Sequence, residues 1–278
     1  MLFSMFLRSF FIQAGWNYER FQNLGFVFAL APALRRIYPD REKLKAALLR
    51  HLEIFNTQPY MSGFVLGNIA AMEERASSAA DPAAELAKMP GVKQALASSF
   101  ASIGDRIFWG RLKPMTAQIC LLVWAAGGFY GWLFTGLDER VPLALLLGGP
   151  LAGTVFYSAF AVYYRWKGVR RGFACGGAAN CALDTVNWPR LIRLLSIAGF
   201  LMSLAIVALA FSLLIGVNGC ACGGWRLALK AVVPVCVLAL HRLTRAFGRS
   251  VFFAAGALLA VSILLFSVFG LEPLKFYL

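Results

Sequence analysis

Apolar and polar residues are unevenly distributed along the chain, and this pattern predicts two regions. Residues 1–115 mix charged and apolar positions, whereas long apolar runs dominate from Thr116 onward. Lipid is the usual cover for such runs, because about 20 consecutive apolar residues suffice for a helix to cross a bilayer. We therefore expect an amino-terminal helical region at 1–115 and a transmembrane helical region at 116–278.

The second region offers four to five membrane segments. Their approximate spans are 116–135, 142–164, 191–216, 227–241 and 251–270. The fourth span is short and contains Lys230 and Pro234, which favours a tilted, broken or re-entrant element over a regular span. The predicted fold class is an all-α integral membrane protein, with interfacial or membrane-embedded segments in the first region.

Helical periodicity is visible in the first region. Asp40 is placed to cap a helix over 41–55, where apolar residues recur at helical spacing. Pro59 is expected to end or bend this helix. A second helix is expected over about 61–75.

Two further segments of the first region carry local signals. The segment 76–91 is small, polar and interrupted by Pro82 and Pro90, which indicates a linker. The amino terminus, MLFSMFLRSFFIQAGW, has a short apolar part that Arg8 interrupts, and no small-x-small cleavage site follows it. We interpret it as an uncleaved amphipathic or membrane-seated segment.

Composition supports the membrane interpretation and argues against nucleic-acid binding. Hydrophobic residues make up 60% of the chain and charged residues only 14%, whereas soluble domains carry about a quarter charged residues. The net charge is +14. The cations lie mostly beside apolar runs, as membrane topology and anionic lipid headgroups require, and no RNA-binding or zinc-finger signature is present.

Loop charges predict an orientation for the spans. Cytoplasmic loops are enriched in lysine and arginine, so we expect the amino-terminal region inside and the carboxyl terminus outside. The cationic positions that define the inner face are Arg106, Arg111, Lys113, Arg165, Lys167, Arg170, Arg171, Arg190, Arg193, His241, Arg242, Arg245 and Arg249. The group Arg165–Arg171 is expected to set topology and contact anionic lipid, with docking of an acidic partner domain as the alternative.

The cysteines do not indicate a metal site. They are Cys120, Cys175, Cys181, Cys220, Cys222 and Cys236. The spacings C-x5-C and C-x-C are not typical of structural zinc, and the predicted topology places these two pairs on opposite membrane faces. We expect free thiols in glycine-rich loops, with a disulfide in the outward loop at 220–222 as the main exception.

Short motifs in the first region carry a family resemblance. They are RSFFIQAGWNYERFQNLGFVFALAPALRRIY at 8–38, LLRHLEIFNTQPYMSGFVLGNIAAMEE at 48–74 and SIGDRIFW at 102–109. Their order and spacing resemble the IID family of the mannose/fructose/sorbose phosphotransferase systems. The resemblance is tight over 8–115 and looser beyond. The chain departs from the family pattern at SSFAS before Gly104, at Ile54 and at Arg106.

The resemblance implies a subunit of a phosphoenolpyruvate-dependent sugar permease in the bacterial inner membrane. Such a subunit works with a IIC membrane subunit, in a trimer of IIC–IID pairs, while IIA and IIB domains phosphorylate the incoming hexose. It implies no phosphorylation site, no catalytic residue and no cofactor on this chain. The departures at Ser98–Ser102 motivate one alternative, a non-transporting regulatory or scaffolding component of an incomplete phosphotransferase system.

Several polar residues in the motifs have sugar-binding chemistry. Amides and carboxylates exchange hydrogen bonds with hydroxyl groups, and an aromatic ring can lie beneath a sugar. The candidates for substrate binding or for the transport pathway are Trp16, Asn17, Glu19, Gln22, Asn56 and Glu73. The structural alternative is a hydrogen-bond or ion-pair network that locks helices together, and a buried Glu73 would need a partner or a function.

Other motif residues are interpreted as structural. They are Arg20, Gly25, Pro32, Tyr38, His51, Thr57, Pro59, Gly104 and Asp105. Thr57 is expected to cap the helix that follows it, and His51 to be a packing histidine rather than a proton carrier. Gly104 and Asp105 are expected to form a tight turn. Gly63, Gly67, Asn68 and Ala70 form a small-residue face suited to close helix packing.

Overall fold

The structure is a computed structural model that describes residues 1–127 and 143–217, together with the isolated positions 242, 256 and 260. The described residues are helical and contain no named β-strand. The helices are α1 (Leu2–Ser9), α2 (Asn23–Ile37), α3 (Arg41–Arg50), α4 (Ser62–Ser78), α5 (Pro82–Gly104), a π-helical segment (Asp105–Leu112), α6 (Lys113–Ala126), α8 (Leu143–Ala174), α9 (Ala179–Leu183) and α10 (Trp188–Val217).

The chain divides into two compact units. The first contains Met1–Trp124 and Leu143–Ser203, and the second contains Ala125–Pro142 and Leu204–Leu278. Most of the second unit lies outside the described residues, as do the spans predicted at 227–241 and 251–270 and the cysteines Cys220, Cys222 and Cys236. The architecture below is that of the first unit.

The helix predicted after Asp40 is present but shorter than expected. The Asp40 side chain accepts a hydrogen bond from the Lys43 N–H (2.9 Å), which confirms the cap. The helix ends at Arg50 rather than near residue 55, because Phe55 pairs through its backbone with the loop before α2: the Phe55 N–H donates to the Arg20 carbonyl (3.3 Å). Tertiary pairing therefore overrides the apolar periodicity, and Pro59 has no part in ending α3.

The helix expected over 61–75 is confirmed as α4, but the linker predicted at 76–91 is wrong. Most of that segment is the first half of α5. Asp81 caps the helix by accepting from the Ala84 N–H (3.1 Å), and Pro82 occupies the first turn, where its missing N–H costs nothing. Pro82 is thus part of a helix start, and Pro90 lies inside the same helix.

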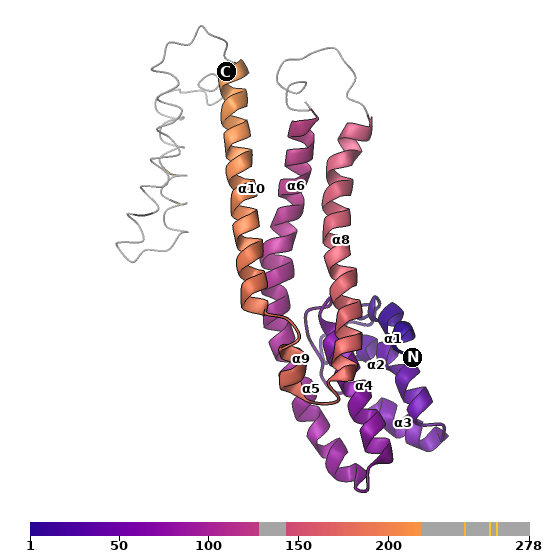
Figure 1. The fold of residues 1–278 in the computed structure, drawn as a ribbon. Coiled ribbons are helices and arrows are strands. Elements are labelled where there is room, and N and C mark those ends of the chain that lie inside the picture. The colour runs from indigo at the N-terminus through magenta and orange to yellow at the C-terminus, as the bar shows by residue number, and fades with distance from the viewer. Residues whose placement is uncertain (128–142, 218–241, 243–255, 257–259, 261–278) are drawn as a thin grey trace. The chain divides into compact units, whose positions relative to one another are not determined.

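The tight turn predicted at Gly104 and Asp105 is also wrong. The chain passes from α5 through the π-helical segment into α6 as one uninterrupted helical stretch (Figure 1). Gly104 is needed for close packing instead, because a Cβ there would lie 2.5 Å from the Gln58 Cβ. Asp105 is exposed at the start of the π-helical segment.

Helices α4 and α8 are held together by two facing pairs of glycines, Gly63 and Gly67 on α4 and Gly168 and Gly172 on α8. A Cβ on Gly63 would lie 2.5 Å from the Arg165 carbonyl oxygen, and one on Gly168 would lie 2.7 Å from the Phe64 nitrogen. A Cβ on Gly67 or Gly172 would overlap the facing backbone. The small-residue face expected on α4 therefore packs backbone against backbone, as in membrane helix pairs.

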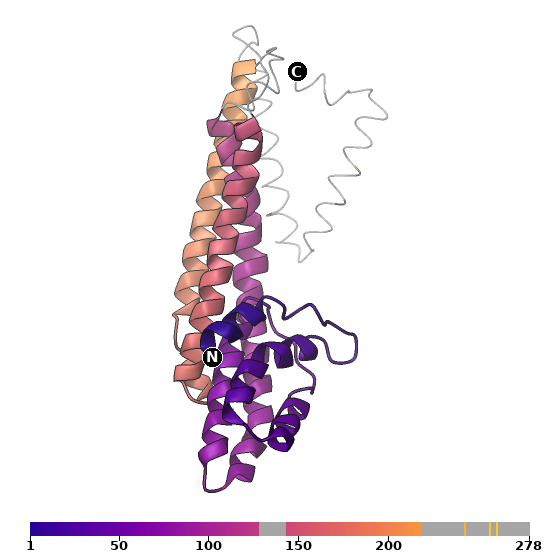
Figure 2. The same cartoon turned by 90° about the vertical axis from the view of Figure 1, so that its right-hand side faces the viewer.

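Two described helical stretches are long and apolar enough to cross a membrane. They are Leu146–Ala174 and Asn180–Leu209, with mean hydropathy of 1.3 and 2.2. They overlap the spans predicted at 142–164 and 191–216, and their large apolar side chains are mostly exposed. Within the first unit, α6 and α8 run side by side, and α1–α5 pack around the carboxyl-terminal end of α8 (Figures 1 and 2).

Arg165 joins the amino-terminal segment to α8. The expected amphipathic segment forms α1, and the Arg165 guanidinium donates to the carbonyl of Ser9, its last residue. The same guanidinium stacks on the rings of Phe10 (4.8 Å) and Tyr60 (5.1 Å). A cation at a helix carboxyl terminus is favourable. Arg165 is only 4% exposed, so the expectation that it contacts anionic lipid is wrong, whereas Arg170 and Arg171 are exposed.

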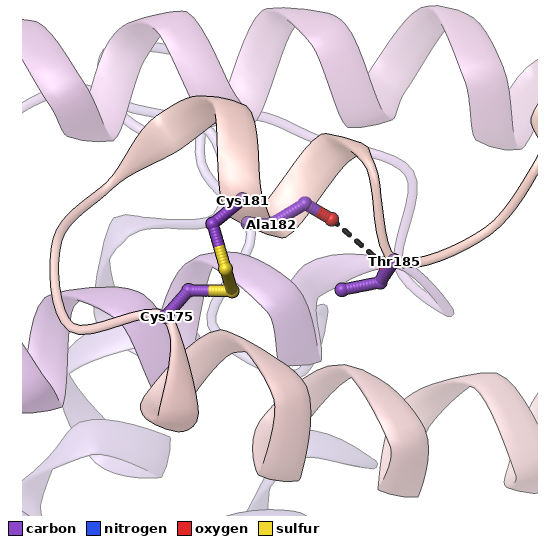
Figure 3. Close-up of a disulfide and its surroundings, with 4 residues drawn as sticks. All are labelled: Cys175, Cys181, Ala182 and Thr185. Carbon is purple, nitrogen blue, oxygen red and sulfur yellow. Dashed lines mark hydrogen bonds between the residues drawn. A yellow bond between two sulfur atoms is a disulfide. The ribbon is translucent and has the colours of Figure 1, made fainter.

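Cys175 and Cys181 form a disulfide between α8 and α9 (Figure 3), so the free thiols predicted for this pair are wrong. Their Cα atoms are 5.6 Å apart. Gly176 and Gly177 both have positive φ, at 56° and 89°, which folds the chain back and brings the two cysteines together. Within the described residues, Cys120 is a free thiol.

Candidate functional site

A buried carboxylate, Glu73, lies at the centre of the amino-terminal helices. Its Oε2 accepts from the Tyr38 hydroxyl (2.7 Å), and its Oε1 lies 2.8 Å from His51 Nε2 and 2.9 Å from Arg50 Nε. These partners come from the ends of α2 and α3, while Glu73 itself lies on α4. Motif residues from the ends of two other helices therefore meet at the Glu73 carboxylate, and Glu73 has the partners that its burial requires.

The protonation states within this cluster follow from burial and pairing. Burial lowers the pKa of His51, so the imidazole is neutral and its Nε2–H donates to Glu73. Burial alone would raise the pKa of Glu73, but the hydrogen bonds from His51 and Tyr38 and the charge of Arg50 lower it overall. Burial and the Glu73 charge raise the pKa of Tyr38. The cluster therefore holds one carboxylate opposite one guanidinium.

Lys93 on α5 forms a second ion pair beside the first, again with one fully buried member. Its side chain is fully buried, and its Nζ donates to Glu53 Oε1 (3.0 Å) and to the His51 carbonyl (3.4 Å). The ammonium also lies 4.6 Å from the centre of the Phe26 ring. Burial lowers the pKa of Lys93, while Glu53 opposes this shift. Together the two ion pairs connect α2, α3, α4 and α5 without excess charge.

A set of polar contacts joins the segments 16–22 and 52–58, which we call the paired loops. The Gln22 side chain donates to the Thr57 carbonyl (2.9 Å) and accepts from the Thr57 N–H (3.1 Å). The Thr57 hydroxyl donates to the Ala97 carbonyl on α5 (2.9 Å). The prediction that Thr57 caps α4 is therefore wrong, because the Thr57 hydroxyl bridges to another helix. The cap position of α4 is Met61.

Asn17 and Arg20 complete the first of the paired loops. The Arg20 N–H donates to Asn17 Oδ1 (2.8 Å), and Asn17 Nδ2 donates to Asn23 Oδ1 (2.9 Å). The Arg20 guanidinium and the Asn23 amide both donate to the Leu52 carbonyl, at 3.1 and 2.8 Å. The side chains of Asn17 and Gln22 are thus already hydrogen-bonded within the paired loops, where they stabilise the backbone conformation.

The remaining candidates lie on the exposed edge of the paired loops. Trp16, Glu19 and Asn56 are exposed, and the Trp16 ring meets the ring of Tyr18 edge-on at 4.8 Å. Figure 2 shows the loop that follows α1 extending away from the helices. The candidates therefore fall into three settings: Glu73 in the buried cluster, Asn17 and Gln22 in the loop contacts, and Trp16, Glu19 and Asn56 at the edge.

The other motif residues have packing roles in the structure. Gly25 lies on α2 where a Cβ would overlap the Ile12 backbone, and Pro32 lies inside the same helix. Pro59 precedes α4, and its carbonyl accepts from the Ser62 hydroxyl (2.8 Å). Among the residues that the structure describes, no group of three histidine, cysteine or acidic residues could hold a metal ion.

Sequence reasoning missed Arg50, Asn23 and Lys93. Arg50 directly precedes His51 in the motif, and Asn23 directly follows Gln22. Because both lie next to residues already singled out, their positions in the sequence could have identified them. Lys93 lies just beyond the segment 76–91 interpreted as a linker. Nothing in its sequence neighbourhood indicates that it is buried, because its partner Glu53 is 40 positions away.

Comparison with known proteins identifies a family. Residues 1–220 match the family model described as the PTS system mannose/fructose/sorbose family IID component. The chain is 35% identical over 173 residues to the mannose-specific EIID component of Escherichia coli K12, which covers 62% of this chain and 54% of that protein. It is 31% identical over 179 residues to the fructose permease IID component of Bacillus subtilis, and the match covers 63% of this chain and 56% of that protein.

A solved structure agrees with these matches. It is described as a membrane protein, shares 25% identity with this chain and has a TM-score of 0.62, with 96% of each chain covered. The matched regions span about half the length of the curated relatives. The family model covers most of the chain and includes the buried cluster, the paired loops and the α4–α8 glycines. This helical membrane protein therefore belongs to the mannose/fructose/sorbose family of phosphotransferase-system IID components.

Proposed function

We propose that the chain is the IID subunit of a sugar permease that takes up a hexose at the expense of phosphoenolpyruvate. The observation that carries this proposal is the family match over residues 1–220, together with the relatives named as mannose-specific and fructose permease components. Those relatives are sugar-transport components by name, and this chain retains the motif residues in one folded arrangement. The sugar is a hexose of the kind those names indicate.

The chain works with partners, because it does not provide the phosphoryl chemistry itself. A IIC membrane subunit shares the transport path in a trimer of IIC–IID pairs, and IIA and IIB domains deliver the phosphate. His51 supports this division of labour. It is 1% exposed, and its Nε2 is engaged with Glu73 at 2.8 Å, so it is poorly placed to attack a phosphoryl group.

The exposed edge of the paired loops is the part of this chain that meets the sugar path or the IIC subunit. Trp16, Glu19 and Asn56 present an aromatic ring, a carboxylate and an amide there, and Asn17 and Gln22 hold the backbone behind them. Ordered loops with exposed, unengaged polar side chains are suited to recognition. Glu73 contributes by fixing the helices rather than by contacting sugar.

The chain crosses the inner membrane several times, with its amino-terminal region on the cytoplasmic side. The support is the lysine and arginine pattern of the loops and the two apolar helical stretches. In this orientation the Cys175–Cys181 disulfide faces the cytoplasm, so it would have to persist in a reducing compartment. A cysteine introduced at the exposed Arg171, in a variant without the native cysteines, tests the orientation. Labelling in cells by a membrane-permeant but not by an impermeant maleimide would support it, and labelling by both would contradict it.

Uptake measurements test the function directly. The chain is expressed with its IIC, IIA and IIB partners in a strain that lacks its own hexose transporters, and phosphoenolpyruvate-dependent uptake of labelled hexoses is measured with and without it. We expect uptake to require the chain. Asn56→Ala and Glu19→Ala should each reduce uptake roughly tenfold, equivalent to about 1.4 kcal/mol, the size of one lost hydrogen bond.

Matched controls are available on the exposed surface of the same region. Glu42→Ala and Glu74→Ala remove exposed carboxylates away from the paired loops and should leave uptake unchanged. Absence of uptake of any tested hexose, despite a complex that assembles in the membrane, would overturn the transport proposal. Equal losses in the controls and in the loop variants would overturn the role of the paired loops alone.

A further inference from the structure

A groove of about 470 Å³ lies between α6 and α8, within the first unit. It is lined by Tyr60, Trp109, Lys113, Thr116, Ala117, Cys120, Pro150, Gly153, Thr154, Tyr157 and Ser158. The two helices approach closely at one point of it, since a Cβ on Gly153 would lie 2.7 Å from the Thr116 carbonyl oxygen. None of the motif residues proposed for sugar transport lines this groove.

One wall of the groove belongs to a helix that is apolar enough to cross a membrane. Its α8 wall, from Pro150 to Ser158, lies within the apolar stretch Leu146–Ala174. The side chains that flank it on α8, Leu151 and Val155, are 58% and 66% exposed, as expected for positions that face lipid. A ligand that enters here therefore comes from the membrane rather than from water.

A cation lies at one end of the groove. Lys113 is the first residue of α6, and its Nζ lies 5.0 Å from the centre of the Trp109 ring. Among the described residues, no carboxylate pairs with Lys113, in contrast to the buried Lys93. A lysine beside a tryptophan at the start of a membrane helix is the arrangement found at the level of lipid headgroups.

The chemistry of the walls favours an acyl chain over a sugar. Among the described residues, no carboxylate or amide lines the groove, and the Thr116 hydroxyl already donates to the Lys113 carbonyl (2.6 Å). The rings of Tyr60 and Tyr157 meet edge-on at 5.5 Å. Hydroxyl groups are present in the walls, but the exposed surface of the groove is mostly apolar, which suits an acyl chain better than a sugar.

We propose that this groove is a binding site for one anionic phospholipid. The phosphate lies against Lys113 and Trp109, and one acyl chain follows the groove between α6 and α8 toward Pro150. The inference depends on the membrane location of the chain but not on sugar transport. It also assigns a role to Lys113 that differs from that of the exposed arginines elsewhere on the inner face.

Native mass spectrometry of the chain purified in mild detergent tests the proposal, with added phosphatidylglycerol and phosphatidylethanolamine as probes. We expect phosphatidylglycerol to bind more tightly and Lys113→Glu to weaken it about tenfold or more, because each unit of charge near the surface changes lipid binding about fivefold. Lys167→Glu is the matched control, since Lys167 lies 5.3 Å from the Tyr163 ring but does not line the groove.

A second pair of variants tests the acyl-chain part of the site. Thr154→Phe fills the groove and should remove bound lipid, whereas Val155→Phe adds the same ring to the neighbouring exposed position outside it and should not. Thermal midpoints confirm that all variants are folded, and Lys113→Gln replaces Lys113→Glu if that variant is not. Sugar uptake is not a readout, so failure of transport and failure of this site are distinguishable.

Three results would overturn the proposal. The first is equal binding of the two lipids to the wild-type chain. The second is an equal loss for Lys113→Glu and Lys167→Glu, which would show a general surface charge effect. The third is lipid binding that is retained in Thr154→Phe, which would show that the acyl chain does not occupy the groove.

Discussion

Helix α4 is stabilised in two different ways along its two faces. One face carries Glu73, a buried charge that is held by Tyr38, Arg50 and His51. The other carries Gly63 and Gly67, which allow direct backbone contact with α8. The first face depends on electrostatics and hydrogen bonds, so it is sensitive to pH and to loss of a partner. The second depends on shape alone, so it is sensitive to volume and insensitive to pH.

The largest effect is expected from Glu73→Ala. The change leaves the half-buried Arg50 guanidinium, the Tyr38 hydroxyl and the buried His51 N–H without their acceptor, and such losses cost about 3–5 kcal/mol. Chemical unfolding of the purified chain should show this decrease in the free energy of unfolding. Glu74→Ala, at the next and exposed position, should change it by less than about 0.5 kcal/mol. Equal effects at both positions would contradict the assignment of the cluster.

A smaller loss is expected at the glycine face. Gly67→Ala pushes a methyl group into the α8 backbone near Val169 and should destabilise the chain by about 1–3 kcal/mol. Gly91→Ala on α5 is the control, because nothing lies within 4 Å of the added Cβ and alanine favours the helix by about 0.5–1 kcal/mol. The two substitutions should therefore have opposite signs, and the same sign would mean that α4 and α8 do not pack closely.

The smallest effect is a dependence on pH that only one face of α4 should show. Because folding lowers the pKa of His51 from its ordinary 6.5, stability should be constant above that pH and fall as the pH drops below it, by at most about 1.4 kcal/mol per pH unit. Glu73, whose pKa folding also lowers, contributes above its ordinary 4.5 and loses that contribution as the pH falls through its folded value.

His51→Gln should remove the step that begins near pH 6.5, since glutamine can still donate to Glu73 but does not titrate. Gly67→Ala should lower the whole curve and leave its shape unchanged. Thermal midpoints measured from pH 8 to pH 5 give both comparisons. A step that persists in His51→Gln would have to come from another group.

Local signals predicted the starts of α3 and α4 correctly, but several ends and connections depended on tertiary contacts. The Asp40 cap and the small-residue face of α4 were readable because they involve neighbours within one helix. The end of α3 was not, because Phe55 pairs with Arg20, 35 positions earlier by their numbers. The apparent break at Pro82 is a helix start, because Asp81, the residue before it, caps the helix.

The candidate site was predicted as a set of residue types rather than as an arrangement. The motifs contain Tyr38, His51 and Glu73, but only the fold shows that these three meet while Trp16, Glu19 and Asn56 remain exposed. The disulfide was missed for a related reason. The spacing of Cys175 and Cys181 is compatible with many conformations, and the left-handed turn at Gly176 and Gly177 selects the one that joins them.

The uninterrupted passage from α5 through the π-helical segment into α6 has a mechanical consequence. Helices that are joined by a loop can move independently, because the loop absorbs displacement, whereas a continuous helix transmits both axial shift and torque along its length. A force applied where Lys93 anchors α5 is thus felt at Lys113 and along the apolar part of α6. The π-helical turns are wider than α-helical turns, so we expect this continuous helix to bend first at the π-helical segment.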